Sequence, residues 1–244
     1  MEPPLSKMEI INRLAARHGF TRYLELCSSK TGNFYRFLDR RALPTAHRLM
    51  YFCPADFNDG LAVDFRTEGM NIRECLSEIS GRALRYDIIL VDPFHDYASS
   101  YRDLAAAFDL LDKGGMLVVH DCRPPNIAVA GPEYIEGEWC GVTYKAYLDF
   151  VFARRLDYRT VDTDYGCGII RKPDRRSRWT RLLRTAAAFP DRDPQRRSER
   201  RRFILLRQQW RDIGSDFDRA FSFFEKHQKQ LLNLISPGEF LRTL

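Results

Sequence analysis

The sequence has no run of 18 or more apolar residues, which is the length a membrane-spanning helix needs. Its opening segment, MEPPLSKMEI, lacks the basic and then apolar layout of a secretory signal peptide. Its six cysteines lie far apart, with no CxxC pair and no His and Cys cluster at zinc-ligand spacing. These absences argue against a membrane protein, a secreted protein and a structural zinc site, and they predict a cytoplasmic protein with reduced thiols.

A surplus of basic over acidic residues is also absent from most of the chain, although the net charge is +6. Residues 171–202 hold 13 Lys and Arg against 4 Asp and Glu, a surplus of +9 that leaves −3 for the remainder. Because the surplus belongs to one segment, it does not indicate a nucleic-acid-binding fold. With 244 residues and 44% apolar content, the chain can bury the core of one domain and carry an appendage.

The clearest pattern is a strand, helix and strand in the middle of the chain. Residues 86–91 and 116–119 are continuous apolar runs rich in β-branched side chains, which is typical of parallel strands buried on both faces. Residues 101–111 have helical spacing, and 113–115, Lys-Gly-Gly, predict the end of that helix. Together they predict a right-handed βαβ unit.

Weaker patterns extend this order in both directions. Further helices are predicted at 8–18, 72–79 and 142–152, and further strands at 23–27, 47–53, 61–65, 158–161 and 168–171. The last two strands flank a turn sequence and predict an antiparallel hairpin at the sheet edge. The fold class expected is α/β, a doubly wound, Rossmann-like, mostly parallel sheet closed by that hairpin.

Three regions follow from this reading: a domain over residues 1–172, a linker or weakly ordered arm over 173–202, and a helical extension over 203–244. The extension has helical character over 203–234, with aromatic residues among mixed charges, which favours packing on the domain or on a second copy over a membrane surface. Homodimerisation through this helix is therefore a prediction.

In an open parallel sheet, ligands bind beyond the carboxyl ends of the strands, so polar residues there are the candidate site. Glu25 and the loop 27–33 follow one strand, Asp92 and His95 follow another, and His120 and Asp121 follow a third. An ordinary turn and a histidine bonded to turn backbone are the plainer readings of the first two. Two carboxylates and an imidazole can hold a divalent cation, although an imidazole is a poor ligand for Mg²⁺.

These residues, in the segments YDIILVDPFHDY and DKGGMLVVHD, resemble class I S-adenosylmethionine-dependent methyltransferases, particularly the small-molecule and sugar O-methyltransferase branch. The resemblance covers about residues 20–172. It implies an enzyme whose base is His95 and whose metal, if it uses Mg²⁺, is bound by Asp92, Asp121 and His120, the last standing where an acid is usual. The residues that it implies bind the cofactor are Glu25, Ser28, Ser29, Gly32 and Asp92.

The sequence departs from that family in its cofactor half. Where the family has E-x-G-x-x-x-G, Cys27 replaces the first glycine and Gly32 comes one residue late. The acid that ends the second strand and binds ribose is missing from HRLMYFCP, and Asp56 or Asp59 can replace it only if the loop folds back. These departures motivate an alternative, a non-catalytic binding or scaffold protein on a degenerate methyltransferase fold.

The expected function is methyl transfer from S-adenosylmethionine to a hydroxylated small molecule. Trp139, with 140–141 and 144–145, is a candidate wall for that acceptor or an ordinary core aromatic. A nucleic-acid methyltransferase that uses the Arg-rich segment is a third reading. It is weakened because VDPFHDY is not a base-methylation motif of the (N/D)PP(Y/F) type.

Overall fold

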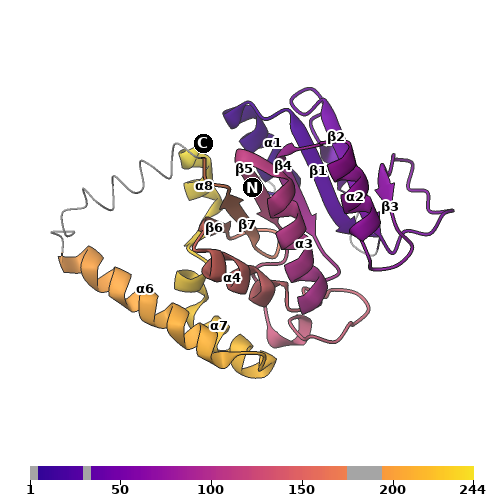
Figure 1. The fold of residues 1–244 in the computed structure, drawn as a ribbon. Helices are drawn as coiled ribbons and strands as arrows, with labels where there is room; N and C mark the ends of the chain where they lie inside the picture. The colour runs from indigo at the N-terminus through magenta and orange to yellow at the C-terminus, as the bar shows by residue number, and fades with distance from the viewer. Residues whose placement is uncertain (1–4, 30–33, 175–193) are drawn as a thin grey trace.

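The structure is a computed structural model that describes residues 5–29, 34–174 and 194–244. Its strands form one eight-stranded sheet in the order β3-β2-β1-β4-β5-β7-β6-β8, with helices on both faces (Figure 1). The strands are β1 (Arg22–Ser28), β2 (Thr45–Tyr51), β3 (Phe65–Arg66), β4 (Tyr86–Asp92), β5 (Leu111–Val119), β6 (Asp157–Val161), β7 (Cys167–Arg171) and β8 (Leu234–Ile235). The α-helices are α1 (Lys7–His18), α2 (Arg73–Gly81), α3 (Tyr97–Leu110), α4 (Thr143–Arg154), α6 (Pro194–Ile213), α7 (Phe217–Leu231) and α8 (Pro237–Thr243).

Strands β1 to β5 pair in parallel, and β7 pairs antiparallel with both β5 and β6. This arrangement confirms the predicted doubly wound sheet and its antiparallel hairpin. The strand order reverses between β1 and β4, so the sheet has a crevice at their carboxyl ends, where ligands bind in folds of this type.

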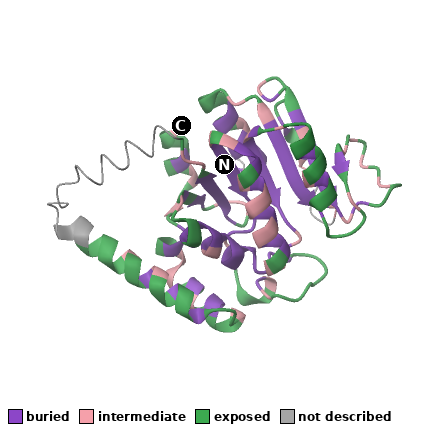
Figure 2. Cartoon of the chain, in the orientation of Figure 1, coloured by how far each residue is buried: buried purple, intermediate pink, exposed green. Residues whose placement is uncertain are grey.

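The central strands are buried on both faces because alternate side chains enter different cores (Figure 2). In β4, Ile89 and Val91 pack with α3 and α4 residues, whereas Ile88 and Leu90 pack with α1 residues. This double burial explains why β4 reads as a continuous apolar run.

Two predicted boundaries in the βαβ unit were wrong. Helix α3 starts at Tyr97, earlier than expected, because the Asp96 side chain accepts a hydrogen bond from Ser99 N at 3.0 Å and caps the helix. The Lys-Gly-Gly segment lies inside β5, where the register with β4 shifts between Tyr86 and Ile88. A Cβ on Gly115 would lie 2.7 Å from Asp87 O, so this bulge brings two backbones together.

The edges of the sheet also differ from expectation. β3 has only two residues, Phe65–Arg66, where 61–65 was predicted, and the hairpin is not the last element. β8, from the C-terminal extension, pairs in parallel with β6 and forms that edge. The extension therefore completes the sheet of the domain that precedes it.

The predicted helix over 203–234 is two helices, α6 and α7. Gly214, at φ +64°, lies between them, and the Asp216 side chain caps α7. Trp210, Phe221 and Phe224 pack around Tyr144 of α4, so the chain's own domain covers the apolar face of the extension.

The arm predicted over 173–202 is partly helical, because α6 begins at Pro194. The rest of its basic run, residues 175–193, lies outside the described residues. In the part of the chain that the structure does describe, we find no helix with the length and apolar character of a membrane span. All six cysteines are free and buried.

Candidate functional site

The ends of β4 and β5 lie beside a cavity of about 350 Å³, and most of the candidate catalytic side chains line it. Asp92 is the last residue of β4, and His120 N donates to Val91 O at 3.0 Å, so the residues after β5 lie next to it. The cavity is lined by Lys7, Phe34, Asp92, Phe94, His95, His120, Asp121, Tyr134, Gly137, Glu138, Trp139, Cys140, Asp164 and Tyr165. The structure therefore brings Asp92, His95, His120 and Asp121 together, as the strand order predicts.

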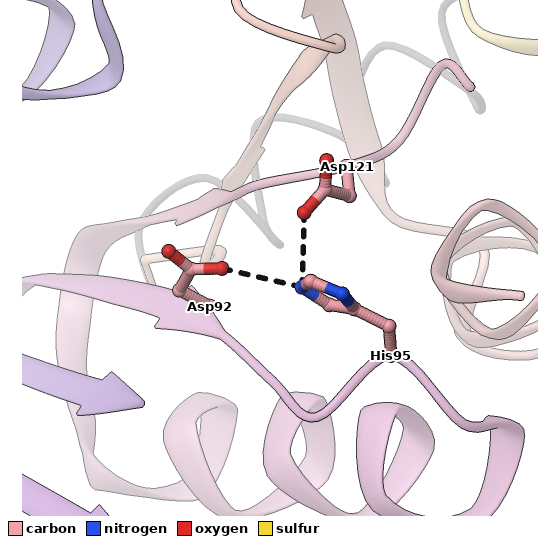
Figure 3. A group of neighbouring side chains, drawn as sticks. All are labelled: Asp92, His95 and Asp121. Carbon is pink, nitrogen blue, oxygen red and sulfur yellow. Dashed lines mark hydrogen bonds and ion pairs between the residues drawn. The ribbon is translucent and has the colours of Figure 1, made fainter. Parts of the chain in front are cut away.

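At its centre, the His95 ring points between two carboxylates (Figure 3). His95 Nε2 lies 2.9 Å from Asp121 Oδ2 and 3.5 Å from Asp92 Oδ1. Its Nδ1 lies 2.6 Å from Trp139 O. Since a carbonyl only accepts, Nδ1 carries a hydrogen there, and Nε2 is the atom that can exchange a proton.

The backbone at His95 has a positive φ angle, a conformation that residues other than glycine seldom adopt. His95 has φ +72°, and its carbonyl oxygen accepts a hydrogen bond from Val142 N at 2.9 Å. A Cβ on Gly141 would lie 2.2 Å from that oxygen, so only glycine fits there. The fold therefore fixes the position of His95 through the segment that starts α4.

Lys7 is a member of this cluster that sequence reasoning missed. Its Nζ lies 2.7 Å from Asp92 Oδ2, with both side chains buried, and 3.9 Å from the centre of the Phe34 ring. A signal was present in the sequence, because position 7 lies on the same helical face as Ile10, Ile11 and Leu14. A lysine on a buried helical face indicates a buried acidic partner.

Asp164 is the second missed residue, and it binds His120. His120 Nε2 lies 3.1 Å from Asp164 Oδ1, and its Nδ1 forms an ion pair with Asp121 Oδ2 at 2.8 Å that is poorly directed for a hydrogen bond. Both nitrogens of His120 thus face acids. Among the described residues, the group whose ligand atoms all lie within 4.8 Å of one another is Asp92, His95 and Asp121, with His95 in the place expected for His120.

The charges of the cluster shift its proton equilibria. Burial alone would lower the pKa of His95, but its hydrogen bonds to Asp121 and Asp92 outweigh burial and raise that pKa to about 9. For Asp92, burial acts to raise the pKa, and the charges of Lys7 and His120 overcome it and hold the pKa well below its usual value. His95 is therefore an imidazolium at neutral pH until something neutralises the carboxylates beside it.

The residues expected to bind the cofactor near β1 are enclosed instead. Glu25 is 1% exposed, accepts from Tyr23 OH at 3.0 Å and lies 3.7 Å from Arg48 Nε. The loop after β2 does fold back, but it brings Asp59 to Arg48 Nη2, at 3.0 Å. Burial raises the pKa of Glu25 to about 7, although Arg48 opposes that rise.

The remaining residues of that loop also face inward or are not described. Ser28 is fully buried, and Ser29 N donates to Tyr51 O at 2.9 Å. Gly32 lies outside the described residues. Glu25, Ser28 and Ser29 do not line the cavity beside Asp92, whereas Trp139, the candidate acceptor wall, does.

No family model and no curated protein matches the chain. The solved structures that it resembles include O-methyltransferases. An O-methyltransferase from Bacillus cereus in complex with SAH has a TM-score of 0.48 and 13% identity over 70% of this chain and 83% of that one. TomG from Streptomyces achromogenes, involved in tomaymycin synthesis and in complex with SAM, has a TM-score of 0.46 and 18% identity over 67% and 78%. Likeness of this degree assigns no activity to the chain.

Proposed function

We propose that the chain is an S-adenosylmethionine-dependent O-methyltransferase that acts on a hydroxyl group of a sugar or another small molecule. The observation that carries the proposal is the position of His95 Nε2, between Asp92 and Asp121 in a cavity at the carboxyl ends of β4 and β5. A base fixed in such a crevice suits proton removal from an acceptor hydroxyl.

In this reaction, the positive charge of a bound sulfonium would offset the carboxylates and leave His95 Nε2 unprotonated. That nitrogen could then take the hydroxyl proton while the acceptor oxygen bonds to the methyl carbon and the bond from that carbon to sulfur breaks. The hydrogen bond from Nδ1 to Trp139 O holds the ring, and Asp121 stabilises the imidazolium that forms. Most of the acceleration comes from alignment, for which effective molarities reach about 10⁵ M or more. The products are a methyl ether and S-adenosylhomocysteine.

The walls of the cavity fit the sulfonium end of S-adenosylmethionine, which supplies a methyl group on positively charged sulfur. Phe94 and Tyr134 stack with ring centres 5.7 Å apart, and Trp139 meets both rings edge-on. Aromatic rings and carboxylates together attract such a cation. Asp92 would lie beside it.

The same cluster holds ligand types that divalent cations use, although the Lys7 ammonium already binds one of its carboxylates. Asp92 and Asp121 offer carboxylate oxygens, which Mg²⁺ prefers, and a cation bound by these two acids would leave His95 Nε2 available as the base. A cation there would polarise the acceptor hydroxyl and offset the charges that keep His95 protonated.

Calorimetric titration with S-adenosylmethionine and S-adenosylhomocysteine, with and without Mg²⁺, tests the proposal. We expect binding in the wild type and its loss in Asp92→Asn, with circular dichroism confirming that the variant is folded. Screening hydroxylated acceptors then follows. Absence of heat under every condition would contradict the proposal and support the non-catalytic scaffold, for which the enclosed Glu25 and Arg48 pair is the motivating observation.

Homodimerisation through the extension stays a prediction. The apolar face that motivated it packs on the same chain, and the exposed pair Ile204 and Leu205 of α6 is what a second copy would cover. A monomer mass in light scattering would refute it.

A further inference from the structure

The two oxygens of Asp92 face different neighbours. Oδ1 faces the ring nitrogens of His95 and His120, each at 3.5 Å, and Oδ2 faces Lys7 Nζ at 2.7 Å. A divalent ion bound by Asp92, His95 and Asp121 would therefore lie beside a carboxylate that already binds an ammonium group.

Lys7 is held in that place by more than its ion pair. Its backbone N donates to Asp164 Oδ2 at 2.9 Å, and a capping box of Ser6 and Glu9 fixes the start of α1 directly before it. Its side chain is 1% exposed, and its ammonium lies over the Phe34 ring. An ammonium group with these constraints does not swing freely into solvent.

Three acids of the cluster, Asp92, Asp121 and Asp164, face three side chains that can carry positive charge, Lys7, His95 and His120. Lys7 is the member whose ordinary pKa keeps it charged throughout the neutral range. An ion of charge +2 on Asp92 would meet its repulsion at short range in a buried site, where charges are weakly screened.

We propose that Lys7 is the resident cation of this site, so that the group Asp92, His95 and Asp121 binds a divalent ion only weakly while the Lys7 ammonium is present. The use of the site in catalysis rests on the proposed function, but the occupancy of Asp92 by Lys7 does not. Lys7 then acts as a positioning residue, which orients Asp92 and sets the metal affinity.

The test is a titration with Mn²⁺, followed by the electron paramagnetic resonance of the free ion, with no cofactor or acceptor present. Protein sites for divalent ions span dissociation constants from about 10⁻⁹ to 10⁻³ M, and we expect the wild type to bind more weakly than about 10⁻⁴ M. We expect Lys7→Met to bind at least about tenfold more tightly, because it removes the repelling charge and keeps the apolar stem.

Lys145→Met is the matched control. Lys145 is also buried and forms an ion pair, with Asp149 at 2.8 Å, but it lies outside the cavity of the candidate site. It should leave Mn²⁺ binding as in the wild type. Adding Asp121→Asn to Lys7→Met should abolish the gain, because one ligand of the group is lost.

Wild-type binding tighter than about 10⁻⁴ M would overturn the inference, and so would equal affinities in the wild type and a folded Lys7→Met. If Lys7→Met does not fold, the wild-type affinity for Mn²⁺ still tests the inference, because binding tighter than about 10⁻⁴ M would overturn it. Methyl transfer is not measured in this experiment, so failure of the proposed function and failure of this inference remain distinguishable.

Discussion

The two halves of the candidate site differ in what their charged groups contact. At the ends of β4 and β5, Asp92, His95 and Asp121 line a cavity of about 350 Å³. In the middle of β1 and β2, Glu25 and Arg48 are buried and bind each other, away from that cavity. Charges of one half can therefore act on a ligand, whereas charges of the other hold the fold.

This difference also distinguishes two acids, Glu25 and Asp92, that were both expected to bind the cofactor. Glu25 lies in the middle of β1 and Asp92 at the end of the adjacent, paired β4, and a buried guanidinium meets Glu25 whereas a cation of the cavity lining meets Asp92. The place of each acid in its strand thus decides its expected role, and substitutions in the two halves should affect different measurements.

The largest effect is expected for His95→Gln. Loss of a general base lowers turnover by about 10²- to 10⁴-fold, whereas the affinity for S-adenosylmethionine should stay close to the wild-type value. Single-turnover rates and calorimetry check the two quantities. His47→Gln, which changes a histidine hydrogen-bonded to Tyr86 away from the cavity, is the control. Equal loss of turnover and binding in His95→Gln would contradict its role as a base.

The enclosed half should respond to Arg48→Met with a loss of stability. This change leaves Glu25 and Asp59 without their buried cation, and breaking such a pair costs about 3–5 kcal/mol of unfolding free energy. Urea denaturation measures it. Arg66→Met, on an exposed arginine of neighbouring β3, should change stability little. An unfolding free energy of Arg48→Met equal to that of the wild type would show that the ion pairs of Arg48 do not stabilise this half.

The backbone that fixes His95 is tested by Gly141→Ala. The added Cβ would lie 2.2 Å from His95 O, so the His95 loop must move, and a displacement of about 1 Å costs about 10²-fold in rate. Gly131→Ala, in the same long loop but with nothing within 4 Å of the added Cβ, is the control. Unchanged turnover in Gly141→Ala would mean that the His95 position is not critical.

The sequence was sufficient to predict the sheet because its central strands are buried on both faces and read as apolar runs. It also placed Asp92, His95 and Asp121 together, since parallel strands end at one edge. Lys7 and Asp164 were missed because their partners lie 85 and 44 residues away, in Asp92 and His120. The apolar face of α1 marks Lys7 as buried, but no local pattern identifies the distant acid that it binds, and none marks Asp164.

In the half expected to bind the cofactor, the sequence suggested a ligand site where the structure has a buried ion pair. Residue types there suggested a ligand, but the buried pair of Arg48 and Glu25 depends on β1 and β2 lying side by side, with these two residues opposite each other in the register. An arginine inside a strand predicts no partner by itself. The β8 strand was missed because two residues, Leu234–Ile235, are too few for a period to emerge.

The smallest expected effect is a pH dependence of stability in the charged half. The pKa of His95 is raised from 6.5 to about 9 on folding, so its contribution is fully present below pH 6.5 and is lost as the pH rises toward 9. Between pH 6.5 and 8 this loss amounts to about 1.5 kcal/mol.

Urea denaturation of the wild type and His95→Gln at both pH values isolates that contribution. Glu25, whose pKa is raised to about 7, also favours the folded state less as pH rises, but it acts equally in both proteins and cancels in their difference. We expect the wild type to lose more stability than the variant. Parallel losses would mean that His95 carries no extra proton in the folded protein, and Lys7 and His120 would then be the cations of the cluster that face the aspartates beside it.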